Sequence, residues 1–231
     1  MSVVEEIAWG DGSGDKIYLT ADALEGNQTV LVSSDANARA PRTKVITFSA
    51  SGATPVTLTV SQDGGTGTEH TVTFNPSSYD TTDYSYDSVS NISRAYGSAS
   101  STNYARIYLT KGSRAETWIY FQFDTSSIPA DAVINSVSCK VKCAIDTTNT
   151  SVVATRTLRL YSGTTSKGDS ATFTNSTSTA VELSSNSTWT RAEAGDIRIR
   201  AYVKRGTSQA STAHYFDFYG ATLTVKYTTY D

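Results

Sequence analysis

The stretch Ala115-Glu-Thr-Trp-Ile-Tyr-Phe-Gln-Phe-Asp124 decides the fold class of this chain. From Ile119 to Phe123 its odd-numbered positions are all apolar, whereas its even-numbered positions carry Trp118, Tyr120 and Gln122. Side chains alternate between the two faces of a strand, so this pattern is typical of a strand with one buried face. The alternation recurs over residues 137–145, 197–203 and 221–227, and no stretch has a helical period. The sequence therefore predicts an all-β protein.

The same alternation predicts which side chains form the core. Within each predicted strand, the apolar positions of one parity face inward and the Thr, Ser and charged positions of the other parity face outward. We expect the following residues to be buried: Ile119, Phe121, Phe123, Val137, Val141, Ile145, Leu158, Leu160, Ile197, Ile199, Val203, Leu223 and Val225.

The composition fits a β-sandwich and argues against some classes of partner. The 231 residues have a formal charge of −3, and 18% of them are charged. Binding to phosphate backbones usually needs a strong basic excess, so free nucleic acid is not an expected partner. Hydrophobic residues make up 38% of the chain, which is enough for a sandwich because only alternate strand residues face the core. The aromatic content of 10% and the regular alternation argue against disorder.

The N-terminal Met-Ser-Val-Val-Glu-Glu carries neither the basic nor the apolar region of a secretory signal. No apolar run approaches the ~20 residues that a membrane span requires. We therefore expect a protein that is made in a cytoplasm, has no membrane partner, and reaches the outside only as part of a particle released by lysis.

Two cysteines, Cys139 and Cys143, lie on one predicted strand. At a rise of about 3.3 Å per residue their Cα atoms are about 13 Å apart, whereas a disulfide needs less than about 7 Å. Their even spacing places both on the predicted inward face. We expect buried free thiols that act as small apolar residues.

The first segment, residues 1–62, carries short predicted strands separated by turn signals rich in Gly, Asp and Asn. Their number and spacing favour a small immunoglobulin-like sandwich. The Gly-rich run Asp63-Gly-Gly-Thr-Gly-Thr68 favours a domain boundary, and residues 63–86 are predicted to be a linker or arm, either ordered or used in a subunit contact. The predicted strands of this part cover residues 6–9, 16–21, 28–33, 43–49, 55–62 and 69–74.

The remaining segment, residues 87–231, carries about ten predicted strands, many of them longer, which favours a jelly-roll sandwich. Residues 190–195 are predicted to form a single helical turn. The strands are predicted over residues 92–95, 105–110, 116–124, 132–146, 154–161, 180–183, 188–191, 197–204, 215–219 and 221–228.

Two stretches resemble known families. Residues 37–62, with Arg42 entering a strand and the closing run Val56-Thr-Leu-Thr-Val-Ser-Gln62, resemble the BACON family of immunoglobulin-like domains; the early Trp motif of that family is represented only by Ile7-Ala-Trp9. Such domains occur in glycan-degrading surface proteins of gut bacteria and in proteins of gut bacteriophages. The resemblance covers about the first 62 residues and implies a small immunoglobulin-like domain there.

The second resemblance covers about residues 88–228. Its signature is Phe121-Gln-Phe-Asp124, the turn Ser127-Ile-Pro129 and the strand opening Ala132-Val-Ile-Asn-Ser-Val137, with Tyr219-Gly-Ala-Thr-Leu-Thr-Val-Lys-Tyr227 as the final strand. These elements are similar to a jelly-roll module of phage minor structural proteins and of DNRLRE-type surface proteins. The resemblance implies a scaffold of a virion or a cell surface, and neither family supplies a catalytic residue.

Several residues are candidates for contacts. Outward aromatic side chains at Trp9, Tyr104, Trp118 and Tyr120 either stack on sugar rings or lie in a subunit interface, and we favour the interface. Outward Lys140, Lys142, Arg198, Arg200 and Lys204 form a basic stripe if their strands are neighbours in one sheet. Such a stripe either holds an acidic glycan or an acidic capsid surface, or is a solvated face, which we favour.

Carboxylates offer two further candidates. Asp11 and Asp15 have the alternate spacing of a calcium loop, but the later Glu of such loops is absent, and a hairpin turn explains them as well. Asp124 is expected to cap the following turn. No nucleophile, phosphate-loop or metal-ligand motif accompanies His70 and His214, so we expect no enzyme and no cofactor.

The sequence thus leads to two hypotheses. In the first, the chain is a non-enzymatic structural component of a bacteriophage virion, either a capsid decoration or head-fibre protein or a tail-associated protein, which serves attachment and display. Other virion proteins are its expected partners, and a homo-oligomer and binding to host or mucus glycans are further expectations. In the alternative, the chain is a carbohydrate-binding module of a bacterial surface protein.

Overall fold

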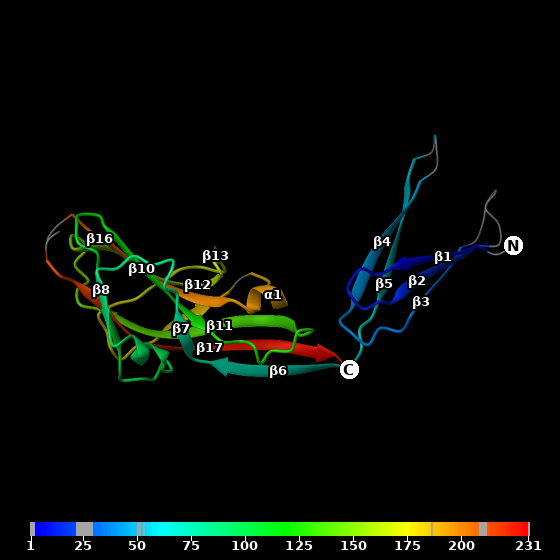
Figure 1. Cartoon of the computed structure of the whole chain (residues 1–231). Helices are drawn as coiled ribbons and strands as arrows, with labels where there is room; N and C mark the ends of the chain where they lie inside the picture. Colours follow the sequence, from blue (N-terminus) through cyan, green and yellow to red (C-terminus); the bar gives the residue numbers. More distant parts are fainter. Residues whose placement is uncertain are drawn as a thin grey trace. The chain divides into compact units, whose positions relative to one another are not determined.

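The computed structural model describes residues 3–21, 30–49, 52, 54–185, 187–207 and 212–230. The chain divides into two compact units, Met1–Thr68 with Tyr230–Asp231, and Glu69–Thr229. Almost all regular structure is strand, which confirms the predicted all-β class (Figure 1).

The N-terminal unit is a small sandwich of a three-stranded and a two-stranded antiparallel sheet. Its buried side chains Trp9, Ile17, Leu19 and Ile46 come from both sheets and form one small core. Of the strand expected over residues 28–33, residues 28 and 29 lie outside the described residues, and the strand begins at Leu31. The strands of this unit are β1 (Val3–Ala8), β2 (Lys16–Ala21) and β3 (Leu31–Ser34) in one sheet, and β4 (Arg42–Phe48) and β5 (Val56–Gln62) in the other.

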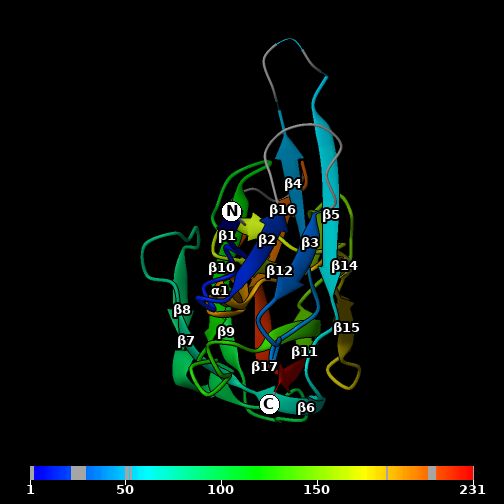
Figure 2. The same cartoon turned by 90° about the vertical axis from the view of Figure 1, so that its right-hand side faces the viewer.

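The β4–β5 hairpin extends past the three-stranded sheet that covers it (Figures 1 and 2). Near its base the cross-strand pair Ile46–Leu58 packs into the core. The next pair on the same face, Phe48–Val56, lies beyond that cover, and Phe48 is 39% and Val56 65% exposed. Neither β4 nor β5 has a second strand neighbour among the described residues.

The larger unit is a sandwich of two six-stranded sheets around a single core. One sheet has the order β13-β12-β16-β10-β7, with β14 also paired to β12; the other has the order β15-β11-β17-β9-β8, with β6 also paired to β17. Its elements are β6 (Gly67–Phe74), β7 (Pro76–Tyr79), β8 (Ser88–Ser90), η1 (Ile92–Tyr96), β9 (Ala105–Tyr108), β10 (Glu116–Phe123), β11 (Val133–Ile145), β12 (Val153–Ser162), β13 (Thr165–Ser166), β14 (Ala171–Thr172), β15 (Val181–Ser184), α1 (Arg191–Ala194), β16 (Ile197–Arg205) and β17 (Tyr215–Tyr230).

The strand order of this unit is that of a jelly roll. Eight strands in chain order are β9, β10, β11, β12, β14, β15, β16 and β17. Counted one to eight, they lie in the orders 1-8-3-6 and 2-7-4-5, so consecutive strands mostly alternate between the two sheets. This is the double-sheet arrangement with two Greek keys that defines a jelly roll. The strands β6, β7, β8 and β13 are additions to it.

Of the two alternatives for residues 63–86, the structure favours an ordered arm over a linker, and the strand expected over residues 69–74 is part of β6. Residues from Glu69 onward belong to the larger unit. β6 pairs with β17 and β7 pairs with β10, so hydrogen bonds between strands hold this segment against the larger unit. Ser85 also bridges to Trp118 of β10. The Ser- and Asp-rich composition of this segment reflects its position at the edge of a sheet.

Four predicted strands differ in the structure. The strand expected over residues 92–95 is the 3-10 helix η1, and the one expected over residues 188–191 is loop that leads into helix α1, the predicted helical turn. The two strands expected on either side of Gly220 are one strand, β17. A register shift against β11 occurs beside Gly220, so the glycine marks a bulge rather than an end.

The predicted core is confirmed. All thirteen side chains expected to be buried belong to the core cluster of the larger unit, with none more than 5% exposed. Cys139 and Cys143 belong to the same cluster and are free thiols, as expected.

Candidate functional site

The outer face of the sheet formed by β12, β16 and β10 carries a regular array of polar and aromatic side chains. The antiparallel register sets Arg159 of β12 opposite Arg200 of β16, and Arg200 opposite Tyr120 of β10. One row further along, Thr157 faces Tyr202, and Tyr202 faces Trp118. Side chains alternate between the two faces of a strand, and the residues next to these along each strand point into the core. These residues therefore share the outer face.

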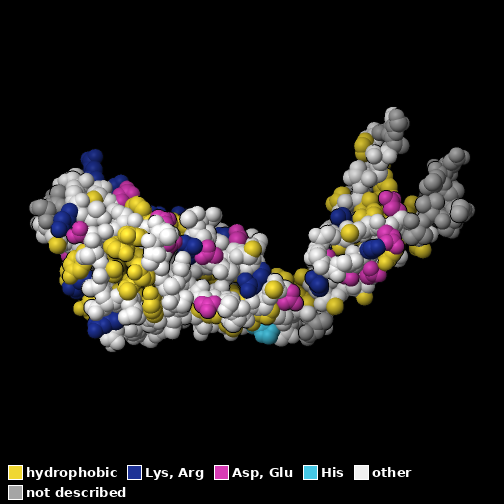
Figure 3. Space-filling model, viewed as in Figure 1, with side chains coloured by type: hydrophobic (Ala, Val, Ile, Leu, Met, Phe, Trp, Pro, Cys, Tyr) yellow, Lys and Arg dark blue, Asp and Glu magenta, His cyan; other side chains and the backbone are white. Residues whose placement is uncertain are grey.

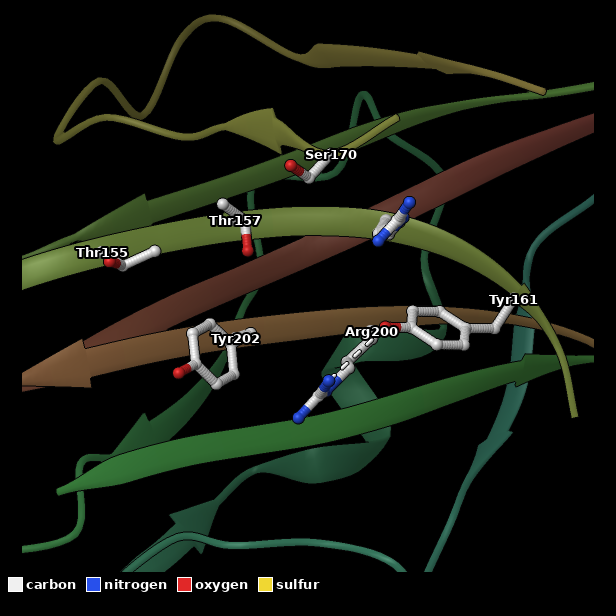
Figure 4. Close-up of a pocket in the computed structure, with 7 residues that line it drawn as sticks. Thr155, Thr157, Tyr161, Ser170, Arg200 and Tyr202 are labelled. Carbon is white, nitrogen blue, oxygen red and sulfur yellow. Dashed lines mark hydrogen bonds between the residues drawn. The ribbon is translucent and has the colours of Figure 1, made fainter. Parts of the chain in front are cut away.

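A shallow hollow of about 290 Å³ lies on this face between β12 and β16 (Figure 4). Every side chain around it ends in a hydroxyl or a guanidinium group. The Tyr161 hydroxyl points toward Arg200, while Thr155 and Thr157 follow β12 and Tyr202 lies on β16 (Figure 4). The lining residues are Thr155, Thr157, Arg159, Tyr161, Ser170, Arg200 and Tyr202.

Arg200 is held among aromatic rings. Its guanidinium carbon lies 5.3 Å from the ring centre of Trp118, 5.7 Å from that of Tyr120 and 4.9 Å from that of Tyr202. Its Nη1 donates to the Tyr161 hydroxyl at 3.4 Å. Its Nε is buried and has no hydrogen-bond partner. Cation–π contacts of this kind orient a guanidinium without neutralising its charge.

The basic residues on either side of Arg200 along β16 are neutralised. Arg198 binds Asp196 and Asp80, with nitrogen–oxygen distances of 2.8 Å and 2.6 Å. Lys204 binds Glu116 at 2.9 Å, and Lys204 and the Tyr202 hydroxyl together hold the pKa of Glu116 below its usual value. Among the ion pairs of the described residues, none includes Arg159 or Arg200.

The four predicted aromatic contact residues divide into two groups. Trp9 is 6% exposed in the core of the N-terminal unit, and Tyr120 is 4% exposed, so the prediction that these two are surface contacts is wrong. Trp118 is half-buried, and its Nε1 donates to Asp83 at 3.0 Å. Tyr104 is half-buried against Tyr219, with ring centres 5.3 Å apart.

The predicted basic stripe is not continuous. Lys140 and Lys142 lie on β11, in the other sheet from β16, so the condition for a single stripe is not met. Lys140 is exposed and pairs with Glu182 across to β15, and Lys142 donates to the carbonyl oxygen of Ser101 at 2.9 Å. The sequence showed which residues face outward but not which strands become neighbours.

Asp11 and Asp15, the candidates for a calcium loop, share one side-chain partner in the structure. The Nη1 of Arg42 lies 2.9 Å from a carboxylate oxygen of each. The guanidinium also lies over the ring of Trp9, at 4.4 Å from its centre. Asp11 further accepts hydrogen bonds from Ser13, which supports the hairpin-turn alternative. Asp124 accepts from the backbone N–H of Ser126, which is the turn contact that we expected.

A second hollow, of about 250 Å³, lies beside Asp146 and Asp217. Asp146 accepts a hydrogen bond from Nδ1 of His214 at 2.8 Å, and Asp217 forms a two-point pair with Arg106. The arginine therefore neutralises one carboxylate and the histidine orients the other. In the described part of the chain no three His, Cys, Asp or Glu side chains are grouped as metal ligands.

Of the seven residues that line the first hollow, only Arg200 is among the residues predicted from the sequence. Sequence reasoning missed the other six: Thr155, Thr157, Arg159, Tyr161, Ser170 and Tyr202. The signal was present, because Leu158 and Leu160 were assigned to the core and Arg159 must then face outward. What the sequence lacked was the pairing of β12 with β16, which brings the two arginines together.

Comparison with known proteins gives little further information. No family model and no curated protein matches the chain. A solved structure described as that of the infectious bursal disease virus Gt strain matches 100% of this chain and 74% of its own, with 13% identity and a TM-score of 0.25. Overlap this weak carries no argument about function. No helix in the described ranges is long and apolar enough to cross a membrane.

Proposed function

We propose that the chain is a non-enzymatic structural component of a bacteriophage particle, a capsid decoration or head-fibre protein or a tail-associated protein, that serves attachment and display. The N-terminal unit docks onto another virion protein, and the jelly roll is displayed outward. The resemblances of residues 37–62 and 88–228 to phage-associated families support this assignment.

The observation that carries the proposal is the exposed apolar hairpin. Phe48 and Val56 extend beyond their covering sheet, and Val45 on the other face of β4 is 57% exposed. Figure 3 shows hydrophobic side chains on the surface of this unit. An exposed apolar hairpin with unpaired edges tends to associate with another surface. A partner protein of the particle that covers it would bury these side chains and satisfy the hairpin edges.

The test is the location of the chain in an infected culture. Gold-labelled antibody against the purified chain should decorate released particles in electron micrographs, at the head or at the tail. Label on the envelope of uninfected cells and none on particles would contradict the proposal and favour the bacterial surface module. The proposed virion protein is also expected to form a homo-oligomer. Light scattering of the pure chain should therefore give a mass that is a multiple of 24.7 kDa.

The hollow between β12 and β16 favours glycan binding as an activity of the displayed unit. Its lining of hydroxyl and guanidinium groups suits a ligand rich in hydroxyls. A carbohydrate-binding module of a bacterial surface protein, the alternative function, would use the same face. The labelling experiment distinguishes the two because it reports location rather than binding.

A further inference from the structure

The centre of the outer β12–β16 face carries two arginines that form no ion pair with the described residues. Arg159 and Arg200 are directly opposite each other in the antiparallel register. Like charges at directly opposed positions destabilise a sheet, so such a pair needs a compensating contact. Arg198 and Lys204 on the same strand have carboxylate partners, whereas neither opposed arginine takes part in an ion pair of the described residues.

Both guanidiniums are already oriented. The backbone carbonyl oxygen of Gly168 accepts from Nε of Arg159 at 2.6 Å. The Tyr161 hydroxyl and three aromatic rings fix Arg200, as described above. Each contact uses only part of the five N–H donors of a guanidinium. The Nε of Arg200 is buried, so the donors that can reach an anion are those on the Nη atoms. Binding through them costs little side-chain entropy, since both side chains are already held.

The hollow between them has the size and chemistry for one sugar residue. Its volume of about 290 Å³ is close to the lower limit for small-molecule sites. Thr155, Thr157 and Ser170 supply hydroxyls that both donate and accept hydrogen bonds, as sugar hydroxyls do. The ring of Tyr202 supplies an aromatic surface beside them (Figure 4).

We propose that this hollow binds an anionic sugar residue of an acidic glycan, with its carboxylate or sulfate between Arg159 and Arg200. Guanidinium groups bind such planar or multi-oxygen anions through paired, charge-assisted hydrogen bonds. A nucleic acid is disfavoured because the flanking basic residues are already paired and the chain is acidic overall. The site deepens the proposed function, and rests on it for the idea that the jelly roll is displayed toward a glycan-bearing surface.

The test is calorimetric titration of the full chain with four probes. These are oligogalacturonate (carboxylated), sulfated galactan oligosaccharides, neutral galactan oligosaccharides and a poly-glutamate peptide. The proposal expects binding of one or both acidic oligosaccharides that weakens as salt increases. Equal binding of the neutral oligosaccharides, equal binding of poly-glutamate, or no binding of any probe would overturn it. The two acidic probes distinguish a carboxylate from a sulfate as the bound group.

Variants assign the binding to the hollow. Arg159→Gln and Arg200→Gln should each weaken binding at least tenfold, since each removes a paired contact to the anion. Arg159→Lys keeps the charge but not the fork of donors, and should bind more weakly than the natural chain. Arg94→Gln, at an exposed arginine of η1, is the matched control and should bind normally. Normal binding by Arg159→Gln would overturn the proposal, whatever Arg200→Gln does to folding.

The result of the glycan titration is independent of whether the chain belongs to a phage particle. Loss of the glycan site would leave antibody labelling of particles unchanged. Conversely, absence of the chain from particles would leave the titration unchanged and would place the same site on the alternative surface module.

Discussion

Burial makes the two thiols of this chain unreactive. Cys139 and Cys143 lie in the core at 2% and 1% exposure, and burial raises the pKa of both thiols. The thiolate is the reactive form, so a thiol that is both hidden and protonated does not react with disulfide reagents. We expect no labelling by Ellman's reagent at pH 8 in the folded protein and two thiols per chain in urea. Rapid labelling without urea would contradict the buried position.

Asp80 links the edge strand β7 to the β16 strand through a buried network. Its carboxylate accepts from the backbone and hydroxyl of Thr82 and from the backbone of Asp83, and it pairs with Arg198 at 2.6 Å. The Thr82 hydrogen bonds are the main reason that the pKa of Asp80 falls to about 2 from an ordinary value of 3.8. Arg198 lowers it further.

The depressed pKa gives a pH-dependent contribution to stability. The contribution is complete above the unfolded pKa near 3.8, and it is lost as the pH falls toward 2. Asp80→Asn should lower the free energy of unfolding at pH 7 by roughly 1–3 kcal/mol. Urea unfolding at several pH values should show this difference shrink between pH 4 and pH 2. Asp131→Asn, at an exposed carboxylate, is the control; a pH-independent difference for Asp80→Asn would contradict the network.

At the scale of elements, side-chain alternation predicted which face of each strand is buried. It did not predict which segments lie beside each strand. The apolar parity of β10, β12 and β16 identified their core residues, because one strand determines its own two faces. Tyr120 and Trp118 were expected outside, but the segment that carries Asp83 and Ser85 runs along β10 and covers that face in part. No local pattern encodes this cover. The opposed arginines depend in the same way on which strands pair.

Gly220 is the element-scale feature that the sequence marked but did not explain. Its φ of +144° lies in a region that side chains rarely adopt, and a Cβ there would lie 2.2 Å from the carbonyl oxygen of Gly97. Ala221 also donates to that oxygen, so the end of η1 crosses β17 at this point. The glycine is therefore required by the close approach of the Gly97 backbone, and it does not mark the end of a strand.

Gly220→Ala should accordingly destabilise the jelly roll by at least about 2 kcal/mol, measured by urea unfolding. Gly112→Ala is the matched control. Gly112 also has a positive φ, of +115°, but its nearest neighbour would lie 3.9 Å from the new Cβ. Gly112→Ala should lower the free energy of unfolding by about 1 kcal/mol, which is the cost of the backbone strain alone. Equal costs for the two variants would show that the contact with Gly97 does not constrain β17.

For the whole molecule, the division into two units implies two separate folding equilibria. The N-terminal core contains four buried side chains, whereas the jelly-roll core contains many times more. Because stability grows with the apolar area that is buried, the small unit should unfold first. Its remaining support is local: Arg42, with 7% of its side chain exposed, joins Asp11 and Asp15 over the ring of Trp9.

Differential scanning calorimetry should therefore resolve two transitions that different substitutions move separately. Arg42→Gln removes the shared partner of two carboxylates and should lower only the first transition, by several degrees. Gly220→Ala should lower only the second. Arg39→Gln, an exposed arginine in the same unit as Arg42, is the control for the loss of charge and should move neither. A single transition that both Arg42→Gln and Gly220→Ala lower would mean that the units unfold together, so that the small core is stabilised by the jelly roll.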